Sequence, residues 1–428
     1  MEVGNLADRR SSQLPVSPTS PPVVVAGVVV WLALFGFGLA GLYDRLAFGA
    51  LNTSLGSYIP WGLWVSGYAW FSGLSSGCFF VSTLFYIFKV KQLQKVAPLA
   101  LVLALITLIM GLLTIGFDLG HMNRAYRVFL HPNFRSVMAW VVWLYTAYFV
   151  LVIFETHFAL RASLIHGRSL AGAAGATARL LTGGRREPLT GEEISRDNRK
   201  VRALAWIGIP LATVFTGGVG AEFATVAARD VWHTALYPIL FLVGACLSGV
   251  ALVTGLTAFF WPHRDDHWRM TVRLLGRIAL GLLLLEVLLT WAELSIPMWF
   301  GVGQEYQELH YLLFGPYGWV FWIVQMGLGT LIPLILLVAG GGSCRATGWA
   351  GILVAVTFLA TRLNLVMPGF FSPELSGLQY SYHDGRLLFS YVPSWPEWQL
   401  LAFVVALGVA LYVIAVKTLP SLTGRDAA

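Results

Sequence analysis

Five carboxylates stand inside long apolar stretches of this sequence, where an ionisable group is unusual. At the centre of a bilayer, such a group costs roughly 2.5–3.5 kcal/mol on insertion scales, so it generally faces protein or water and serves a function. A carboxyl group that burial keeps protonated near neutral pH can take up and release protons. These residues therefore indicate proton exchange. They are Asp118, Glu155, Glu222, Glu286 and Glu293.

The stretches that carry these residues predict an all-α integral membrane protein. Of the 428 residues, 57% are hydrophobic and 11% are charged, whereas a soluble domain carries about 25% charged residues. This composition excludes an ordinary soluble enzyme. Ten stretches reach the roughly 20 residues that a helix needs to cross about 30 Å of hydrocarbon. The ten transmembrane helices are expected near 23–42, 59–88, 97–118, 136–160, 203–227, 235–261, 274–297, 317–339, 348–367 and 396–416.

The distribution of positive charge predicts the orientation. With both termini in the cytoplasm, 20 of the 28 Lys and Arg residues lie on that side, as the positive-inside rule requires. The net charge of +7 therefore indicates topology, and we expect no nucleic-acid partner. Residues 1–22 are predicted to be a disordered cytoplasmic tail, 161–202 a cytoplasmic loop and 418–428 a second cytoplasmic tail.

In this orientation the buried acids are spread over the depth of the bilayer. Glu286 lies near the middle of the seventh helix, and Glu293 follows seven residues later on the same face, about 10.5 Å further out. Together the acids and two histidines would form a ladder of protonatable groups across the bilayer, or else each acid pairs with an arginine or a tryptophan N–H between helices. The ladder would begin with Glu155 and His157 inside, pass Glu286, and end with Glu222, Glu293, Asp118 and His121 near the outer face.

Several cofactor chemistries are not supported. The three cysteines lie far apart, without the spacing of a zinc or iron–sulfur site. A transmembrane di-haem protein needs four histidines inside helices, and only His157 is clearly within a predicted span. No phosphate-binding loop is present. We therefore expect no haem, iron–sulfur cluster or other metal in this chain.

Three stretches carry the most recognisable motifs of the sequence: PWGLWVSGYAWFSGLSSGCFF (60–80), FDLGHMNRAYRVFLHPNFRSVMAWVVW (117–143) and ATRLNLVMPG (360–369). Together they resemble the NrfD/PsrC family of quinone-interacting membrane subunits of respiratory oxidoreductases, although His121 stands where many members have arginine. The resemblance covers about residues 30–417, and the closing YVPSWPEWQLLAF (391–403) is more similar to the longer, ten-helix branch with HybB, DsrP, QrcD and ActC/ActF subunits.

The resemblance implies an architecture and a location. One transmembrane domain, 23–417, would contain two four-helix bundles, formed by helices 2–5 (about 59–227) and helices 6–9 (about 235–367). Helices 1 and 10 would flank them. The protein would lie in a prokaryotic inner membrane.

The resemblance also implies a function. A ferredoxin-like iron–sulfur subunit would dock on the outer face, with molybdopterin-type, hydrogenase or multihaem cytochrome subunits beyond it. Electrons would pass to or from a quinone, menaquinone rather than ubiquinone, in the outer half of the first bundle. Possible coupling to proton translocation would use the acids and His157 named above.

Site roles follow from the same resemblance. Asp118 and His121 would exchange protons with the quinone, on one helical face if the helix continues that far. Trp61, Trp64 and Tyr68 would wall an apolar slot, or else form an interfacial belt. Arg362 and Asn364 are expected to be structural, by snorkelling or by locking the bundles together. Half of the outer Lys and Arg residues lie in one loop and would meet the partner: Arg124, Arg127 and Arg135.

Two other functional classes remain open. A secondary transporter or proton channel would also use buried acids, and the glycine-rich segment 216–220 is the candidate for the broken helix that many transporters have. A purely structural anchor is the third possibility, although it leaves the five acids unexplained.

Overall fold

The computed structural model describes residues 21–167, 187–261, 264–340, 342–373 and 387–419, together with positions 179, 375, 377–381, 384 and 422. The described residues form helices, turns and irregular segments, and none of them lies in a β-strand. Most of both predicted tails, 1–22 and 418–428, lies outside the described residues, as does most of the segment 168–186. The protein is therefore all-helical in the part described.

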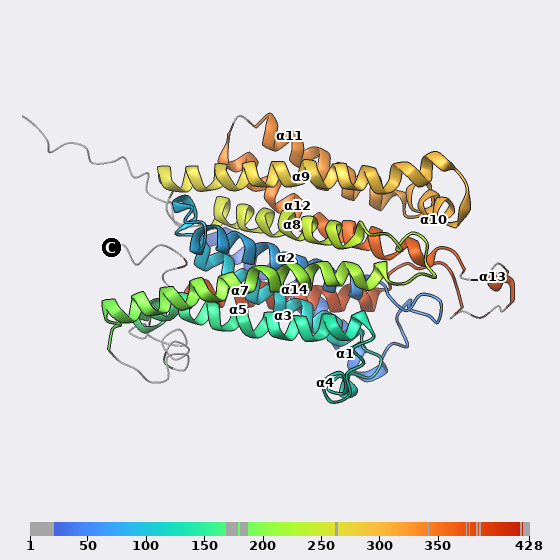
Figure 1. Cartoon of the computed structure of the whole chain (residues 1–428), viewed down its shortest axis with the longest axis horizontal. Helices are drawn as coiled ribbons and strands as arrows, with labels where there is room; N and C mark the ends of the chain where they lie inside the picture. Colours follow the sequence, from blue (N-terminus) through green and yellow to red (C-terminus); the bar gives the residue numbers. More distant parts are fainter. Residues whose placement is uncertain are drawn as a thin grey trace, which may run out of the picture.

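A long helix lies at each of the ten predicted positions. The long helices lie side by side along the long axis of the molecule (Figure 1). Their bounds are α1 Pro21–Phe48, α2 Leu63–Tyr86, α3 Ala97–Asp118, α5 Val137–Gly167, α7 Gly191–Ala224, α8 Tyr237–Phe260, α9 Asp266–Phe300, η3 Val320–Leu331 continued by α11 Ile332–Val338, α12 Cys344–Val366 and α14 Trp395–Thr418.

Eight of these helical stretches are long and apolar enough to cross a membrane. Those at α2 and α9 are not among the eight, although α2 has 24 residues and α9 has 35. The count of ten spans therefore stays a prediction.

Shorter elements lie between the long helices. At the end of the molecule where α3 ends and α2 and α14 begin, here named the Asp118 face, lie α4 and α10 (Figure 1). The opposite face is the end where α5 ends and α7 begins. The short elements are η1 Lys91–Leu93, η2 Met122–Arg124, α4 Arg127–Leu130, α10 Gly303–Phe314, η4 Pro368–Phe370 and α13 Leu378–Ser381.

Local sequence sets several helix boundaries. Thr190 and Glu193 form a reciprocal capping box at the start of α7, which satisfies two free backbone N–H groups. The Asp265 side chain accepts a hydrogen bond from the Trp268 N–H at the start of α9. Gly301 ends α9 with a φ of 68°, a left-handed conformation that glycine adopts without steric cost. Helices α5 and α7 thus extend into the segment predicted as the loop 161–202.

Two groups of helices contact one another. In the first, α2 packs on α3 and α7, and α5 packs on α3 and α7; in the second, α8, α9, α12 and η3–α11 pack together. Helix α1 packs on α14, which contacts α3. These contacts support the implied arrangement of two bundles, which stays a proposal. The groups meet mainly where α2 crosses α8.

Small residues permit this crossing. A Cβ on Gly77 would overlap the carbonyl oxygen of Ala245, and one on Gly249 would overlap the backbone of Gly77 and Cys78. The two backbones therefore approach as closely as in other small-residue membrane contacts. The Cys78 thiol also donates a hydrogen bond of 3.7 Å to the Gly249 carbonyl.

Replacing Gly77 by alanine is expected to destabilise the protein. Overpacking of a close contact typically costs about 1–3 kcal/mol, and here the obstructing atom is backbone that cannot rotate away. Gly281→Ala is the matched control, because a Cβ there meets nothing within 4 Å. Thermal denaturation in detergent, monitored by the loss of the monodisperse peak, measures the difference in stability between the two variants. Equal midpoints for the two variants would contradict the packing argument.

The structure corrects the prediction of a broken helix at 216–220. Helix α7 continues through this segment, and Gly220 instead allows close approach of the Tyr237 carbonyl at the start of α8. The irregular helix is η3, a π-helix of 12 residues that leads directly into α11. Such wide turns are frequent at functional sites.

Candidate functional site

Asp118 is the last residue of α3, and one of its carboxylate oxygens is buried without a hydrogen-bond partner. Arg45, near the end of α1, holds this helix end. Its guanidinium donates hydrogen bonds of 2.6 and 2.7 Å to the carbonyls of Phe117 and Leu119. Arg45 is 3% exposed and interacts electrostatically with Asp118. A buried carboxylate with a free oxygen beside a fixed cation can receive a proton from a bound molecule.

Glu397, in the first turn of α14, adds a second carboxylate to this site. It is 1% exposed and interacts electrostatically with Asp118. The Trp64 indole N–H donates to the Glu397 carbonyl oxygen at 3.1 Å, and the Arg45 guanidinium lies 5.7 Å from the Trp64 ring. Helices α1, α2, α3 and α14 thus each contribute a polar or aromatic side chain here.

Tyr391 links the same carboxylate to α2. Its hydroxyl donates to Glu397 at 2.8 Å and accepts from the Leu63 N–H at 2.8 Å, at the first turn of α2. Burial, followed by the neighbouring Glu397 carboxylate, raises the pKa of the Tyr391 hydroxyl well above its usual value. The hydroxyl therefore keeps its proton and stays a hydrogen-bond donor at neutral pH.

The three aromatic residues predicted to wall a slot contact three different neighbours. Trp61 precedes α2 instead of lying on it, and its ring stacks on Trp232 with centroids 5.8 Å apart. Trp64 contacts α14, as described above. Tyr68 stacks on Tyr145 of α5 at 6.1 Å. Only Trp64 is therefore tied directly to the Asp118 site by a described contact, and the quinone-binding role of all three remains a prediction.

His121 does not share a helical face with Asp118. Helix α3 ends at Asp118, Leu119 leaves the helical conformation, and His121 precedes the short helix η2 with an exposed side chain. A shared face required the helix to continue to His121, and this condition is not met, because Leu119 already has a non-helical backbone beside the carbonyls that Arg45 holds. Three basic residues of the following segment are also exposed on the Asp118 face: Arg124, Arg127 and Arg135.

Two acids lie near the ends of the first helix group. Glu222, in the last turn of α7, interacts electrostatically with the Tyr68 hydroxyl. Glu155, in α5, is fully buried, and both of its carboxylate oxygens lack a hydrogen-bond partner. His157 is partly buried and interacts with Arg161 and the other charges that surround Asp197. Glu155 and His157 therefore lie in different surroundings although they are close in sequence.

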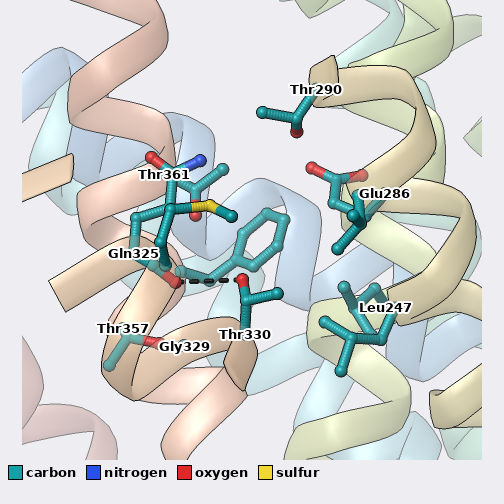
Figure 2. Close-up of a pocket in the computed structure, with 12 residues that line it drawn as sticks. Leu247, Glu286, Thr290, Gln325, Gly329, Thr330, Thr357 and Thr361 are labelled. Carbon is teal, nitrogen blue, oxygen red and sulfur yellow. Dashed lines mark hydrogen bonds between the residues drawn. The ribbon is translucent and has the colours of Figure 1, made fainter. Parts of the chain in front are cut away.

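Glu286 lies in the second helix group beside a small cavity (Figure 2). The side chain is 7% exposed, and both of its oxygens lack a hydrogen-bond partner. The cavity has a volume of about 20 Å³, which is room for one water molecule. Hydroxyl and amide side chains line it around the acid: Thr290, Gln325, Thr330, Thr357 and Thr361.

A second cavity adjoins the first and reaches Glu293. Its volume is about 40 Å³, and it shares with the first cavity the residues Glu286, Thr290, Gln325 and Thr361. Glu293 also lines it. Glu286 and Glu293 therefore line one space that has room for a few waters, and Thr290 lines it as well. Neither of these cavities includes Glu155 or Glu222 in its lining.

Arg362 is the buried cation nearest to Glu286. It is 1% exposed, donates a 3.0 Å hydrogen bond to the Phe241 carbonyl and lies over the Phe241 ring at 4.3 Å. It interacts electrostatically with Glu286. Complete burial excludes snorkelling and leaves the bundle lock, because a Cβ on Gly73 of α2 would also touch the guanidinium. The neighbouring Asn364 donates to Gln325 of the π-helix at 2.7 Å.

A further polar cluster stabilises the Asp118 face of the second group. Glu308 of α10 is 1% exposed and accepts hydrogen bonds from Gln304, at 3.1 Å, and from Ser372. The Arg229 guanidinium donates to the Ser372 carbonyl at 2.9 Å. Burial raises the pKa of Glu308, while the hydrogen bonds from Ser372 and Gln304 act in the opposite direction. These contacts join α10 to the loops beside it.

Sequence reasoning missed several of these functional candidates. Arg45 and Glu397 did not stand out in the sequence, because each lies at a helix end, where a charged residue is ordinary. Tyr391 and Gln325 carry no charge. The glutamate inside the apolar segment WPEWQLL (395–401) was the one signal available, and a helix-capping role accounted for it locally. Among the described residues no group of three or more His, Cys, Asp and Glu side chains is placed to hold a metal ion.

Comparison with known proteins identifies the family. The family model described as polysulphide reductase, NrfD, matches residues 52–374. A selenate reductase subunit from Mesobacillus selenatarsenatis is 31% identical over 388 residues, which cover 90% of this chain and 91% of that protein. The Hdr-like menaquinol oxidoreductase integral membrane subunit of Archaeoglobus fulgidus is 26% identical, over 92% of this chain and 91% of its own length.

A third relative has a lower sequence identity over a similar share of both chains. The menaquinone reductase integral membrane subunit of Nitratidesulfovibrio vulgaris is 22% identical, over 92% of this chain and 91% of its own length. The family match covers well over half of the chain and includes the segment that carries Asp118. This chain therefore belongs to the NrfD family and is a multi-pass integral membrane protein.

Proposed function

We propose that this chain is the quinone-interacting membrane subunit of a respiratory oxidoreductase complex. Its relatives include subunits named for menaquinol oxidation and menaquinone reduction, so menaquinone is the proposed substrate. The observation that carries the proposal is the free, buried carboxylate oxygen of Asp118 beside Arg45, in the segment that resembles the family motif. Quinone chemistry moves two protons with two electrons, and this carboxylate can exchange them.

Purified complex provides the direct test. Titration with a short-chain menaquinol analogue, followed by quenching of tryptophan fluorescence, is expected to give saturable binding. Trp64 lies within the proposed site and reports on it. An Asp118→Asn sample serves to assign the signal to this site. Absence of saturable binding in the assembled wild-type complex would contradict the proposed function.

The proposed electron partner is a ferredoxin-like iron–sulfur subunit on the Asp118 face, with a molybdopterin-type, hydrogenase or multihaem cytochrome subunit beyond it. Support comes from the relatives, which are named as subunits of reductases and oxidoreductases. The exposed arginines of 124–135 complement an acidic partner surface. We propose that this face is extracytoplasmic, that both termini are cytoplasmic, and that the membrane is the inner membrane of a prokaryote.

Reversing the charge of Arg124 and Arg127 together is expected to release this partner. Glutamate at both positions replaces attraction by repulsion, and surface electrostatics of this kind weaken further as salt is added. Co-purification of the partner at moderate salt measures the effect. Arg196→Glu with Arg199→Glu is the matched control, because these residues are exposed on the opposite face. Equal partner retention in both double variants would contradict the docking role.

Proton translocation is a proposed extension of the function. The cavities that join Glu286 to Glu293 supply the bridging space that a relay needs, since the two acids lie two helical turns apart. Glu155, His157 and Glu222 are the proposed further members. A solute transporter would need more room, because cavities of about 20 and 40 Å³ hold only a few waters. The cavities thus favour proton movement over solute transport.

The remaining architectural proposals follow the family resemblance. Residues 23–417 form one transmembrane domain in which α2 and α9 also cross the membrane, giving ten spans. The first bundle consists of α2, α3, α5 and α7, and the second of α8, α9, η3–α11 and α12. The contacts between neighbouring members of each group support this arrangement.

A further inference from the structure

A buried carboxylate connects the Asp118 site to the surface. On one side, the Trp64 indole N–H donates to the Glu397 carbonyl oxygen at 3.1 Å, and the Trp64 ring lies 5.7 Å from Arg45, which holds the carbonyls on both sides of Asp118. Glu397 also interacts electrostatically with Asp118. On the other side, one of its carboxylate oxygens accepts the Ser54 N–H at 3.3 Å. The second oxygen accepts the Tyr391 hydroxyl at 2.8 Å and the Ser394 N–H at 2.9 Å. The Ser54 bond is the longest of the three, so the oxygen that faces Ser54 is the less tightly held.

Ser54 also lines a surface cavity of about 660 Å³. The cavity lies between the α1–α2 connection and the segment that precedes α14, and most of its lining residues are exposed, so water can enter it. Ile59 forms part of its buried wall. The lining therefore leads from bulk solvent to the backbone N–H that contacts Glu397. Other residues that line the cavity are Ser57, Leu388, Ser390 and Val392.

We propose that Glu397 relays protons between Asp118 and water in this cavity, so that proton exchange with the quinone occurs at the Asp118 face. This inference rests on the proposed quinone function. On quinol oxidation, two electrons leave to the iron–sulfur partner. Each of the two hydroxyl protons passes to the Asp118 carboxylate, then to Glu397 and then to water. Quinone reduction reverses every step.

The groups around Glu397 suit a relay that acts through Asp118. Arg45 lies on the Asp118 side and Tyr391 on the opposite side, and Tyr317 also interacts electrostatically with Glu397. Arg45 uses its hydrogen bonds on the carbonyls of Phe117 and Leu119. Arg45 therefore supplies positive charge to the site but forms no ion pair within 4 Å with either carboxylate. Both carboxylates therefore remain available to take up and release protons.

The test is the Glu397→Gln variant of the complete complex. Glutamine also serves at the third position of a capping box, so α14 and the assembly are expected to survive. We expect kcat for a menaquinol analogue to fall roughly 10²-fold, with KM unchanged. The solvent deuterium isotope effect should rise, because proton transfer becomes rate-limiting. Added formate, which can enter the cavity, should restore part of the rate.

Asp44→Asn is the matched control. This carboxylate lies beside Arg45 on α1 but accepts its hydrogen bond from Asn52 at the surface, at 2.6 Å. The kcat, the solvent isotope effect and the formate response of this variant are expected to equal those of the wild type. Ser54→Trp is a second variant that keeps the backbone N–H and places a bulky side chain in the cavity beside Glu397. It should slow turnover while both carboxylates remain.

The outcomes separate this inference from the proposed function. Wild-type complex that neither binds nor oxidises the quinol analogue would contradict the proposed function itself. Active wild type, together with unchanged kcat and isotope effect in assembled Glu397→Gln, would overturn the relay alone. A loss of activity that formate does not relieve, with a normal rate in Ser54→Trp, would assign Glu397 a structural role and would also overturn it.

Discussion

The Asp118→Asn variant is expected to assemble normally and to lose quinone-linked turnover by about 10²–10⁴-fold, the usual contribution of a catalytic acid or base. Asparagine nearly preserves the volume of the side chain but cannot exchange a proton. The Arg45 hydrogen bonds to the carbonyls of Phe117 and Leu119 do not depend on the carboxylate. The helix end should therefore keep its position. The steady-state rate with a menaquinol analogue and the purified partner complex measures the loss.

Asp230→Asn provides the control for this experiment, since Asp230 is an exposed carboxylate on the same face. It should retain the wild-type rate. The His121→Phe variant then asks whether the exposed imidazole takes part, as the family resemblance implies. Wild-type turnover in an assembled Asp118→Asn complex would disprove the assignment of this carboxylate.

Glu286→Gln is expected to abolish the membrane potential that turnover generates, while much of the electron transfer continues. The carboxylate lines both of the cavities between α9, the π-helix and α12, so it is the group through which any protons moved across the membrane in addition to the two quinone protons would pass. Glutamine fills the same space and can hydrogen-bond to the surrounding threonines. Liposomes that contain the complex, a quinone analogue and a potential-sensitive dye measure the effect.

The matched control is Glu308→Gln, which removes a buried carboxylate that lies on the Asp118 face and lines neither cavity. It should leave the potential intact. Wild-type turnover without any potential would eliminate the relay, and so would a full potential in the Glu286→Gln vesicles. The second result would leave the quinone function standing, because that function depends on Asp118 in the first bundle.

The positions of the helices and of the buried acids were predictable because both depend on local composition. A run of about 20 apolar residues forms a helix in a membrane whatever its neighbours are, since lipid offers no partner for backbone N–H groups. Helix bounds were less predictable. The helices α5 and α7 extend into the segment expected to be a loop, because the capping box at Thr190 begins α7 before its apolar part.

Residues that act by meeting across the chain were not predictable. Arg45, Asp118 and Glu397 are far apart in sequence, and both Arg45 and Glu397 stand at a helix end where a charged residue has an ordinary local explanation. The same limit affected Trp61, Trp64 and Tyr68. Their spacing placed them near one another, but the structure directs each ring to a different neighbour.

The sequence by itself determined that this protein is helical, belongs in a membrane and carries protonatable groups at several depths, because hydrophobicity and charge are properties of single residues and short segments. Only the tertiary structure decided which of those groups share a cavity, which oxygens lack partners and how Asp118 connects to the surface. These features arise where side chains from distant helices meet, as where Glu286 lies beside the π-helix and Glu397 beside Ser54. Such meetings depend on how every helix is rotated and packed, and no local segment specifies that rotation.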